Sequence, residues 1–281
     1  MVGKVVMVTG ANAGMGRQVS LELARSGATV VMVCRSPEKG EEARSAVQSV
    51  SGNAVELLVA DMSLIASVRE LARAFAARHD SLHALVNNVG VTLPQRSETA
   101  EGIESTFATN HLGPFLLTNL LLPRLKAGAP SRIVTVSSGV QAMARLKLDD
   151  LQSKAGYDGV RAYNQTKLLN LLFTYELSRR LAGTEVTANA VEPGFVKTNM
   201  KVPFPFSLFS FMRAPVVKGA WITVHAVTAP ELATVSGKFL NNRGAEIRSS
   251  AASYDEDSAR RLWEISAELS GVGSGDGFRL G

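Results

Sequence analysis

Short apolar runs that alternate with longer segments of helical periodicity constrain the fold of this chain more than any other feature of its sequence. The runs are rich in β-branched residues and lack the polar alternation of a half-exposed strand, so each is expected to be buried on both faces. Helices that cover both faces of a parallel sheet provide this burial. We expect strands at residues 5–8, 30–33, 55–59, 84–86, 133–136, 186–191 and 237–240.

Helical periodicity fills the intervals between these strands. It is clearest at residues 16–25, 67–78, 107–126, 160–181 and 218–227. This alternation predicts an α/β fold with one doubly wound, Rossmann-type sheet of seven parallel strands and helices on both faces. We expect a single domain over residues 1–281, with a long apolar loop at about 198–215 and a Gly-rich C-terminal tail at about 270–281 that is either mobile or packed on a partner.

Composition argues against several classes of protein. The formal net charge is +5, but Lys and Arg are spread along the chain, and without a clustered basic stripe we expect no nucleic-acid partner. The single cysteine, Cys34, cannot form an internal disulfide. No apolar stretch reaches the ~18 residues of a membrane span, and no secretory signal precedes the first strand, so we expect a cytoplasmic protein. The four His residues lack ligand spacing, so we expect no metal site.

The turn after the first strand is the first candidate binding site. Three glycines there, Gly10, Gly14 and Gly16, let the backbone turn tightly and approach a ligand closely at the start of the next helix. The free N–H groups of a helix N-terminus attract a phosphate. We therefore expect the pyrophosphate of a dinucleotide here, with a plain strand-to-helix turn as the alternative. The candidate residues are Gly10, Asn12, Ala13, Gly14, Met15 and Gly16.

Polar residues also follow the second, third and fourth strands, at the edge where a doubly wound sheet binds ligands. Arg35 and Ser36 stand where a carboxylate would bind the adenosine ribose of an unphosphorylated cofactor, and an arginine suits a 2′-phosphate instead, which favours NADP(H). Arg17 could add a second positive charge. Asp61 could bind the adenine amino group or cap the following helix. The remaining candidates at these strand ends are Met62, Asn88, Val89 and Gly90.

Tyr163 and Lys167 lie four residues apart in a helical segment, so both side chains can face one site. An unperturbed phenol has a pKa near 10. The ammonium of Lys167, together with an oxidised nicotinamide, would favour its phenolate. Tyr163 is therefore a candidate for proton transfer at neutral pH. Two further polar residues stand at related places: Ser138 follows the fifth strand, and Asn110 lies in the segment 107–126.

Taken in order, these motifs resemble those of the short-chain dehydrogenase/reductase family, from Lys4 to about Leu240. The chain is most similar to the retinol-dehydrogenase-like, NADP-dependent branch, on the basis of Cys34-Arg35 and the segment 164–180. The matching motifs are Thr9-Gly10-x3-Gly14-x-Gly16, Asp61, Asn87-Asn88-x-Gly90, Asn110, Ser138, Tyr163-x3-Lys167 and Pro193-Gly194.

The resemblance implies a role for each of these residues. Tyr163 would transfer the proton, and Lys167 would hold the nicotinamide ribose and lower the barrier electrostatically. Ser138 would orient the reacting oxygen while Ser137 faces the fold, and Asn110 would position a water that relays protons to the lysine. Residues after the sixth strand would hold the nicotinamide carboxamide, namely Pro193, Gly194, Val196 and Thr198.

These roles imply an NADP(H)-dependent oxidoreductase that interconverts a carbonyl and an alcohol on a bulky, apolar small molecule, working as a reductase. The loop at 198–215 would be the substrate lid, with a subunit contact in a homo-oligomer or a weak contact with a membrane surface as alternatives. For the function, the alternatives are a catalytically silent cofactor-binding or scaffold protein, and an epimerase or dehydratase of the same family.

Overall fold

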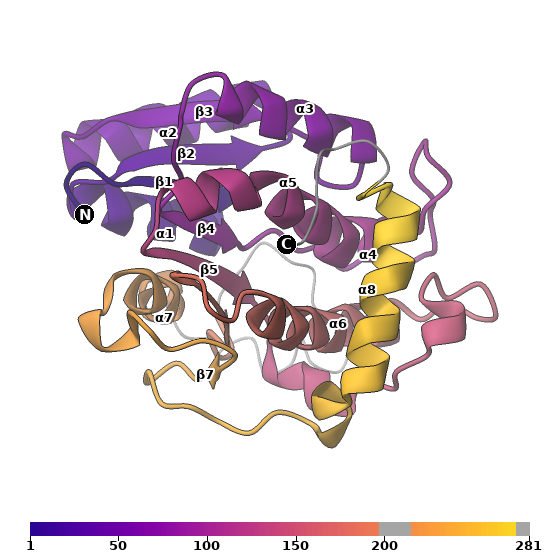
Figure 1. Cartoon of the computed structure of the whole chain (residues 1–281). Helices are drawn as coiled ribbons and strands as arrows, with labels where there is room; N and C mark the ends of the chain where they lie inside the picture. Colours follow the sequence, from indigo (N-terminus) through magenta and orange to yellow (C-terminus); the bar gives the residue numbers. More distant parts are fainter. Residues whose placement is uncertain (197–214, 274–281) are drawn as a thin grey trace.

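Seven parallel strands form one sheet in the order β3-β2-β1-β4-β5-β6-β7 in the computed structural model, which describes residues 1–196 and 215–273 (Figure 1). Every strand begins and ends within two residues of its predicted range, so the expected fold class is confirmed. The strands are β1 (Val5–Thr9), β2 (Thr29–Cys34), β3 (Val55–Val59), β4 (Ala84–Asn87), β5 (Ser131–Val136), β6 (Val186–Val191) and β7 (Phe239–Leu240).

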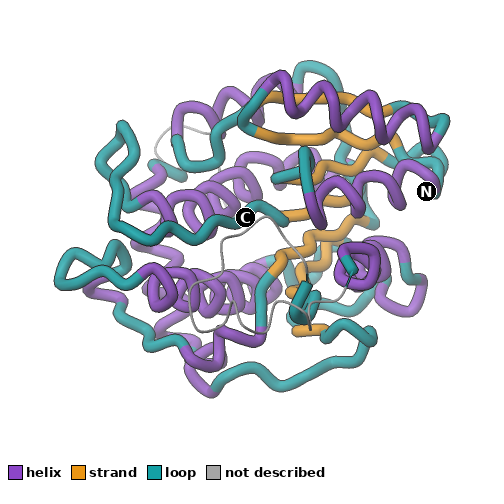
Figure 2. The backbone as a smooth tube through the Cα atoms, turned by 180° about the vertical axis from the view of Figure 1, so that it is seen from behind, coloured by secondary structure: helices purple, strands orange, loops and turns teal. Residues whose placement is uncertain are grey.

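Helices cover both faces of this sheet, which is why the strand sequences are apolar throughout (Figure 2). One layer consists of α1 (Gly14–Arg25), α2 (Pro37–Ser51) and α7 (Val216–Thr228). The other consists of α3 (Ile65–Ala76), α5 (Gly113–Ala127) and α6 (Gly159–Arg180). Separate apolar cores lie under the two layers, one with Val19 and Ile222 and the other with Phe75, Phe115 and Phe173.

The predicted helix at 107–126 is one run of helix interrupted by a wider turn. It starts as α4 (Ser105–Phe107), passes through a π-helical turn at Ala108–Leu112, and continues as α5. Gly113 ends the turn where the helix touches the loop after β3, because a Cβ on Gly113 would lie only 2.0 Å from the Met62 carbonyl oxygen. π-helical turns are uncommon and often occur at functional sites, and this one contains Asn110.

α2 and a C-terminal helix, α8 (Glu256–Ser270), were not predicted from the sequence. α8 begins at Asp255, whose carboxylate accepts a hydrogen bond from Ser258 N, and it lies alongside α6 (Figure 1). The start of the expected Gly-rich tail is fixed to the fold, because Arg69 donates hydrogen bonds to the carbonyl oxygens of Ser270 and Gly271 at 2.9 and 3.0 Å. Residues 274–281 of that tail lie outside the described residues.

Short 3₁₀ helices complete the described chain, at Gly139–Met143, Leu148–Asp150, Pro230–Leu232 and Ala251–Tyr254. Within residues 1–196 and 215–273, no helix combines the length and the apolar character that crossing a membrane requires.

Candidate active site

The turn between β1 and α1 has the geometry of a phosphate-binding turn. Gly10 and Gly14 adopt left-handed backbone conformations, with φ of +66° and +54°. Gly16 lies so close to the turn that a Cβ on it would come within 2.3 Å of the Gly10 carbonyl oxygen, which only a glycine avoids. Ala13 caps α1 without a side-chain hydrogen bond, and the first turn holds no acidic residue. The N–H groups at this helix start are therefore suited to an anion.

The ends of β1 and β4 meet beside this turn, at the point where the strand order reverses. Thr9 Oγ1 accepts hydrogen bonds from the backbone N–H groups of Asn88 and Val89, both at 3.1 Å. Asn88 Nδ2 in turn donates to the Thr9 carbonyl oxygen at 2.8 Å. Asn88 thus ties two strand ends together. Thr9 was not among the candidates, although its position at the end of the first strand is a usable signal.

Arg35 and Asp61 lie together beyond β2 and β3. Arg35 is 80% exposed, and its Nη1 lies 3.7 Å from Asp61 Oδ2. The other carboxylate oxygen, Oδ1, accepts hydrogen bonds from the Ser63 N–H at 2.9 Å and the Ser63 hydroxyl at 2.7 Å. Ser36 caps α2 by accepting a hydrogen bond from Lys39 N. The guanidinium is therefore free to reach a ligand without leaving a buried partner behind.

The alternative role of Asp61 as a helix cap is wrong. α3 begins four residues later, and its first N–H groups are bound by Glu101 from a distant loop. The Glu101 carboxylate accepts from Ile65 N at 2.6 Å and from Ala66 N at 3.0 Å. Asp61 is consequently not needed to begin α3.

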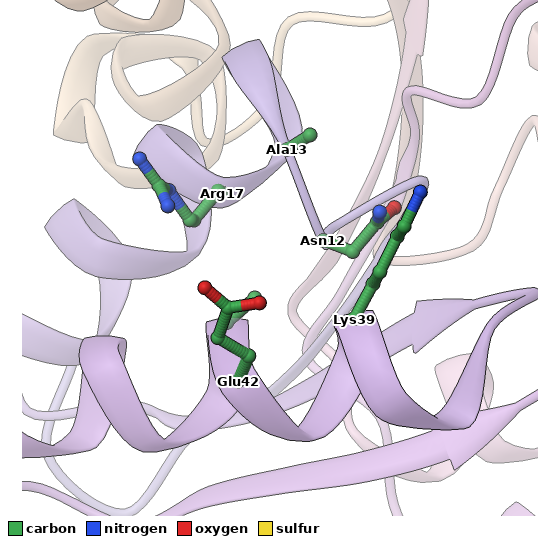
Figure 3. A pocket seen from close by; sticks show the side chains of 6 residues that line it. Asn12, Ala13, Arg17, Lys39 and Glu42 are labelled. Carbon is green, nitrogen blue, oxygen red and sulfur yellow. The ribbon is translucent and has the colours of Figure 1, made fainter.

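A pocket of ≈ 220 Å³ lies between the β1–α1 turn and α2 (Figure 3). Lys39 extends from α2 toward the turn that carries Asn12, while Arg17 and Glu42 line the pocket from α1 and α2. Lys39 was not predicted to belong to the site. Its place four residues after Arg35 is a signal that the sequence does contain. The lining residues are Asn12, Ala13, Arg17, Lys39, Glu42 and Ala43.

Tyr163 and Lys167 lie on one face of α6, as their spacing predicted. Lys167 Nζ lies over the Tyr163 ring, 5.3 Å from its centroid, and donates a hydrogen bond to the Val136 carbonyl oxygen at 2.9 Å. The Lys167 side chain is buried, whereas Tyr163 is partly exposed. A Cβ on Gly90 would lie 3.7 Å from Lys167 Nζ. The lysine therefore stands directly beneath the loop that follows β4.

Burial changes the acidity of both groups. Desolvation raises the pKa of Tyr163 to about 12, and it lowers the pKa of Lys167 to about 8. We expected the ammonium to favour the phenolate, but within the chain itself the desolvation of the phenol is the larger effect. Near neutral pH the phenol is protonated and the amine is mostly charged, so the pair can supply a proton.

Asn110 is buried inside the π-helical turn and connects two parts of the site. Its Oδ1 accepts from Val91 N at 2.8 Å, and its Nδ2 donates to the Val91 carbonyl oxygen at 2.9 Å. The same Nδ2 donates to Thr166 Oγ1 at 3.1 Å. Asn110 thereby joins the loop after β4 to the residue that precedes Lys167.

The two serines after β5 point in different directions. Ser137 is buried, and its hydroxyl donates to the Lys167 carbonyl oxygen at 2.8 Å, so it faces the fold as predicted. Ser138 is partly exposed at the start of a 3₁₀ helix, where its hydroxyl accepts a weak hydrogen bond from Val140 N at 3.4 Å. The Ser138 hydroxyl is therefore free to donate to a ligand.

Three of the candidate cofactor residues use their side chains for packing. Met62 is buried in the core with Phe75 and Phe115. Met15 and Val196 both lie against Gly219 of α7, where a Cβ would come within 3.3 Å of the Met15 sulfur and 2.3 Å of Val196 Cγ2. Met62 and Val196, which are both buried, would therefore meet a ligand mainly through their backbone.

The segment after β6 is described as far as Val196. Gly194 has a φ of +78° and lies close to the Asn242 side chain, and Pro193 is buried. Thr198 and the predicted lid, apart from Pro215, lie outside the described residues. No cluster of three or more His, Cys, Asp or Glu residues that could hold a metal occurs within the described ranges.

A parallel sheet with a glycine-lined helix start at its switch point defines a Rossmann-type nucleotide-binding protein. The sequence matches the family model for short chain dehydrogenases over residues 4–205, and the chain belongs to this family. The family uses NAD(P), and the retinol dehydrogenase relatives support an oxidoreductase that acts on CH–OH groups.

The relatives extend over almost the whole chain. Retinol dehydrogenase 12 of Mus musculus is 41% identical over 276 residues, covering 96% of this chain and 87% of the relative. Retinol dehydrogenase 11 of Homo sapiens is 42% identical over 277 residues, with 96% and 86% covered. Among solved structures, an uncharacterised protein from Mycobacterium paratuberculosis is 34% identical, with a TM-score of 0.80 and coverage of 96% and 94%. The chain is thus retinol-dehydrogenase-like within its family.

Proposed function

We propose that this protein is an NADP(H)-dependent reductase that converts a carbonyl group on a bulky, apolar substrate into an alcohol. Relatives at 41% and 42% identity are named retinol dehydrogenases, which supports an alcohol or carbonyl of the retinol type as the substrate class. Three cations, Arg17, Arg35 and Lys39, lie near the β1–α1 turn and support a phosphorylated cofactor. Cells generally keep the NADP(H) pool reduced, and this favours the direction of reduction.

The residues of the turn fit such a cofactor. Gly14 is open on the side where a Cβ would stand, so a pyrophosphate can approach the backbone closely. The uncapped start of α1 supplies N–H donors for its charge. Arg35 and Lys39 would bind the 2′-phosphate, Asp61 the adenine amino group, and Asn88 to Gly90 the adenosine ribose. Pro193, Gly194 and the following residues would hold the nicotinamide carboxamide.

The chemistry divides between cofactor and protein. The bound cofactor supplies the hydride. Tyr163 donates its phenolic proton to the substrate oxygen, and Ser138 holds that oxygen by a hydrogen bond. The Lys167 ammonium stabilises the negative charge that develops on the phenol as the proton leaves. Asn110 supports Lys167 through Thr166, and it would hold a water that returns a proton to the amine.

One observation carries this proposal: the Lys167 ammonium lies over the ring of Tyr163 and close to Gly90 in the loop after β4. Removing the phenolic oxygen should therefore abolish proton transfer and leave cofactor binding intact. A cofactor-binding protein without catalytic activity would place no such requirement on the phenol.

The test compares Tyr163→Phe with Tyr175→Phe. Tyr175 is a buried phenol of the same helix that bonds Ser249, so its replacement removes a hydroxyl away from the site. A panel of apolar ketones and aldehydes is followed by nicotinamide absorbance with NADPH and with NADH. We expect Tyr163→Phe to lose at least about 100-fold in kcat, with the Kd for NADPH within twofold of wild type by fluorescence titration. Unchanged kcat would overturn the role of Tyr163.

The direction of the reaction needs its own measurement. Steady-state rates with NADPH plus ketone are compared with rates for NADP plus the matching secondary alcohol. Faster oxidation at cellular cofactor ratios would refute the proposed direction. Absence of turnover in both directions, together with tight NADPH binding, would favour the catalytically silent alternative.

A further inference from the structure

The C-terminal helix α8 contacts the helix that carries Asn110. Trp263 of α8 lies against Phe115 of α5 and Phe173 of α6, with ring centroids 4.9 and 5.9 Å apart. The Arg180 guanidinium also lies over the Trp263 ring, with its central carbon 4.2 Å from the ring centroid. The helix is thus firmly attached next to the π-helical turn, although its own residues lie outside the candidate active site.

Among the described residues, the polar side-chain contact that joins α8 to that turn is between His111 and Ser266. His111 Nε2 lies 3.0 Å from Ser266 Oγ, and both residues are buried, with exposed fractions of 1% and 0%. The His111 ring also lies near Phe107, with centroids 5.5 Å apart. Burial lowers the pKa of His111 to about 4, so the ring is neutral at physiological pH. A neutral imidazole nitrogen can either donate a hydrogen bond to a hydroxyl or accept one from it, and the Ser266 hydroxyl lies where it can form this bond.

His111 immediately follows Asn110, so the backbone couples the two side chains. On the inner side, Asn110 holds Val91 and Thr166. On the outer side, His111 holds Ser266. These two side-chain anchors therefore help to hold the orientation of the π-helical turn, together with Asn170 of α6, which also faces His111.

We propose that Ser266, acting through His111, is a positioning residue that keeps Asn110 in its hydrogen bonds with Val91 and Thr166, next to Lys167. The C-terminal helix thereby belongs to the support of the catalytic site, in addition to its role in packing. The inference rests on the proposed function only for its kinetic readout. Its structural readout, the Asn110–Val91 hydrogen bond, is independent of turnover.

Two serines of α8 provide a matched pair of variants. Ser266→Ala removes the hydroxyl that meets His111. Ser270→Ala removes another buried hydroxyl of the same helix, which bonds the Ser266 carbonyl oxygen at 2.6 Å and is not bonded to the His111 ring. Both variants are compared with wild type well below their melting temperatures. Ser266→Cys, which keeps the size of the side chain with a weaker hydrogen-bonding group, serves if the alanine variant does not fold.

The first readout is hydrogen exchange of the Val91 amide, which donates directly to Asn110 Oδ1. Loss of one buried hydrogen bond corresponds to about a tenfold change in such an equilibrium. We expect the Val91 amide to exchange about tenfold faster in Ser266→Ala than in Ser270→Ala. Equal exchange in the two variants would overturn the inference, whether or not the protein proves to be a reductase.

The second readout is kinetic. We expect kcat of Ser266→Ala to fall about tenfold, with KM for NADPH within twofold, because the cofactor residues of the β1–α1 turn are not bonded to this helix. Ser270→Ala should keep the wild-type kcat. A purely structural role for Ser266 would lower the melting temperature and leave kcat and Val91 exchange unchanged, and that result would refute the proposal.

Discussion

Replacement of Arg35 by alanine tests the cofactor preference directly. The guanidinium is 80% exposed and its ion pair with Asp61 is long, at 3.7 Å. Its removal therefore costs the fold almost nothing, since exposed ion pairs contribute little to stability. The effect on a 2′-phosphate should be much larger, because the variant loses a cation and leaves the Asp61 carboxylate without its neutralising partner near the phosphate.

The expected loss in kcat/KM for NADPH follows from the exposure of the Arg35 side chain. A hydrogen bond between charged groups is worth about 1.5–3 kcal/mol, and solvent screening at so exposed a side chain places the value near the lower half of this range. We take about 2 kcal/mol, which corresponds to about a 30-fold loss in kcat/KM for NADPH. NADH lacks the 2′-phosphate, so its kcat/KM should change less than about twofold.

The assay is steady-state kinetics with both cofactors at one saturating ketone concentration. Arg25→Ala is the matched control, because Arg25 lies at the opposite end of α1 and is also largely exposed. It removes the same charge away from the pocket and should leave both cofactors unaffected. The argument that Arg35 binds the 2′-phosphate would be refuted if Arg35→Ala lost kcat/KM equally with NADPH and NADH, or lost none with either cofactor.

Two further predictions concern the turn and the proton donor. Gly16→Ala places a Cβ 2.3 Å from the Gly10 carbonyl oxygen and should distort the turn. Calorimetric titration should therefore show that the affinity for NADPH falls by at least about tenfold. Wild-type affinity in this variant would contradict the need for close approach at Gly16. Lys167 has a pKa lowered to about 8, whereas the Tyr163 phenol, at about 12, stays protonated. The rate of reduction should therefore fall as pH rises through about 8, because the Lys167 amine loses its charge. A flat profile of kcat between about pH 6 and pH 10 would contradict the role of the Lys167 charge in proton transfer.

Local patterns in the sequence predicted much of the fold and of the candidate site. The strands are continuous apolar runs, so burial on two faces could be inferred without knowledge of their partners. The spacing of Tyr163 and Lys167 was sufficient to place them on one helix face, and the two serines after β5 were correctly divided into an inward and an outward one. Each of these inferences depends on residues that are close in the sequence.

The features that were missed depend on contacts between distant segments. Glu101 caps α3 from more than 30 residues away, which is why Asp61 was wrongly considered as its cap. Ser266 and His111 are separated by 155 positions in the sequence, so no local pattern predicts their contact. The pKa of Tyr163 was expected to fall beside Lys167, but desolvation depends on everything that surrounds the ring and raises it. α2 was missed because its apolar positions are few. α8 does carry a local signal that was not used, namely a capping Asp255 followed by Leu262, Ile265 and Leu269 at helical spacing.

The bond between Thr9 and Asn88 has a consequence for the order in which the molecule can assemble. The two residues are separated by 79 positions, so the nucleotide crevice has no second wall until the ribosome has released the chain well beyond β4. Chains that end before β4 should therefore lack the ability to retain nucleotide, and cofactor capture should begin only after β4 has paired with β1.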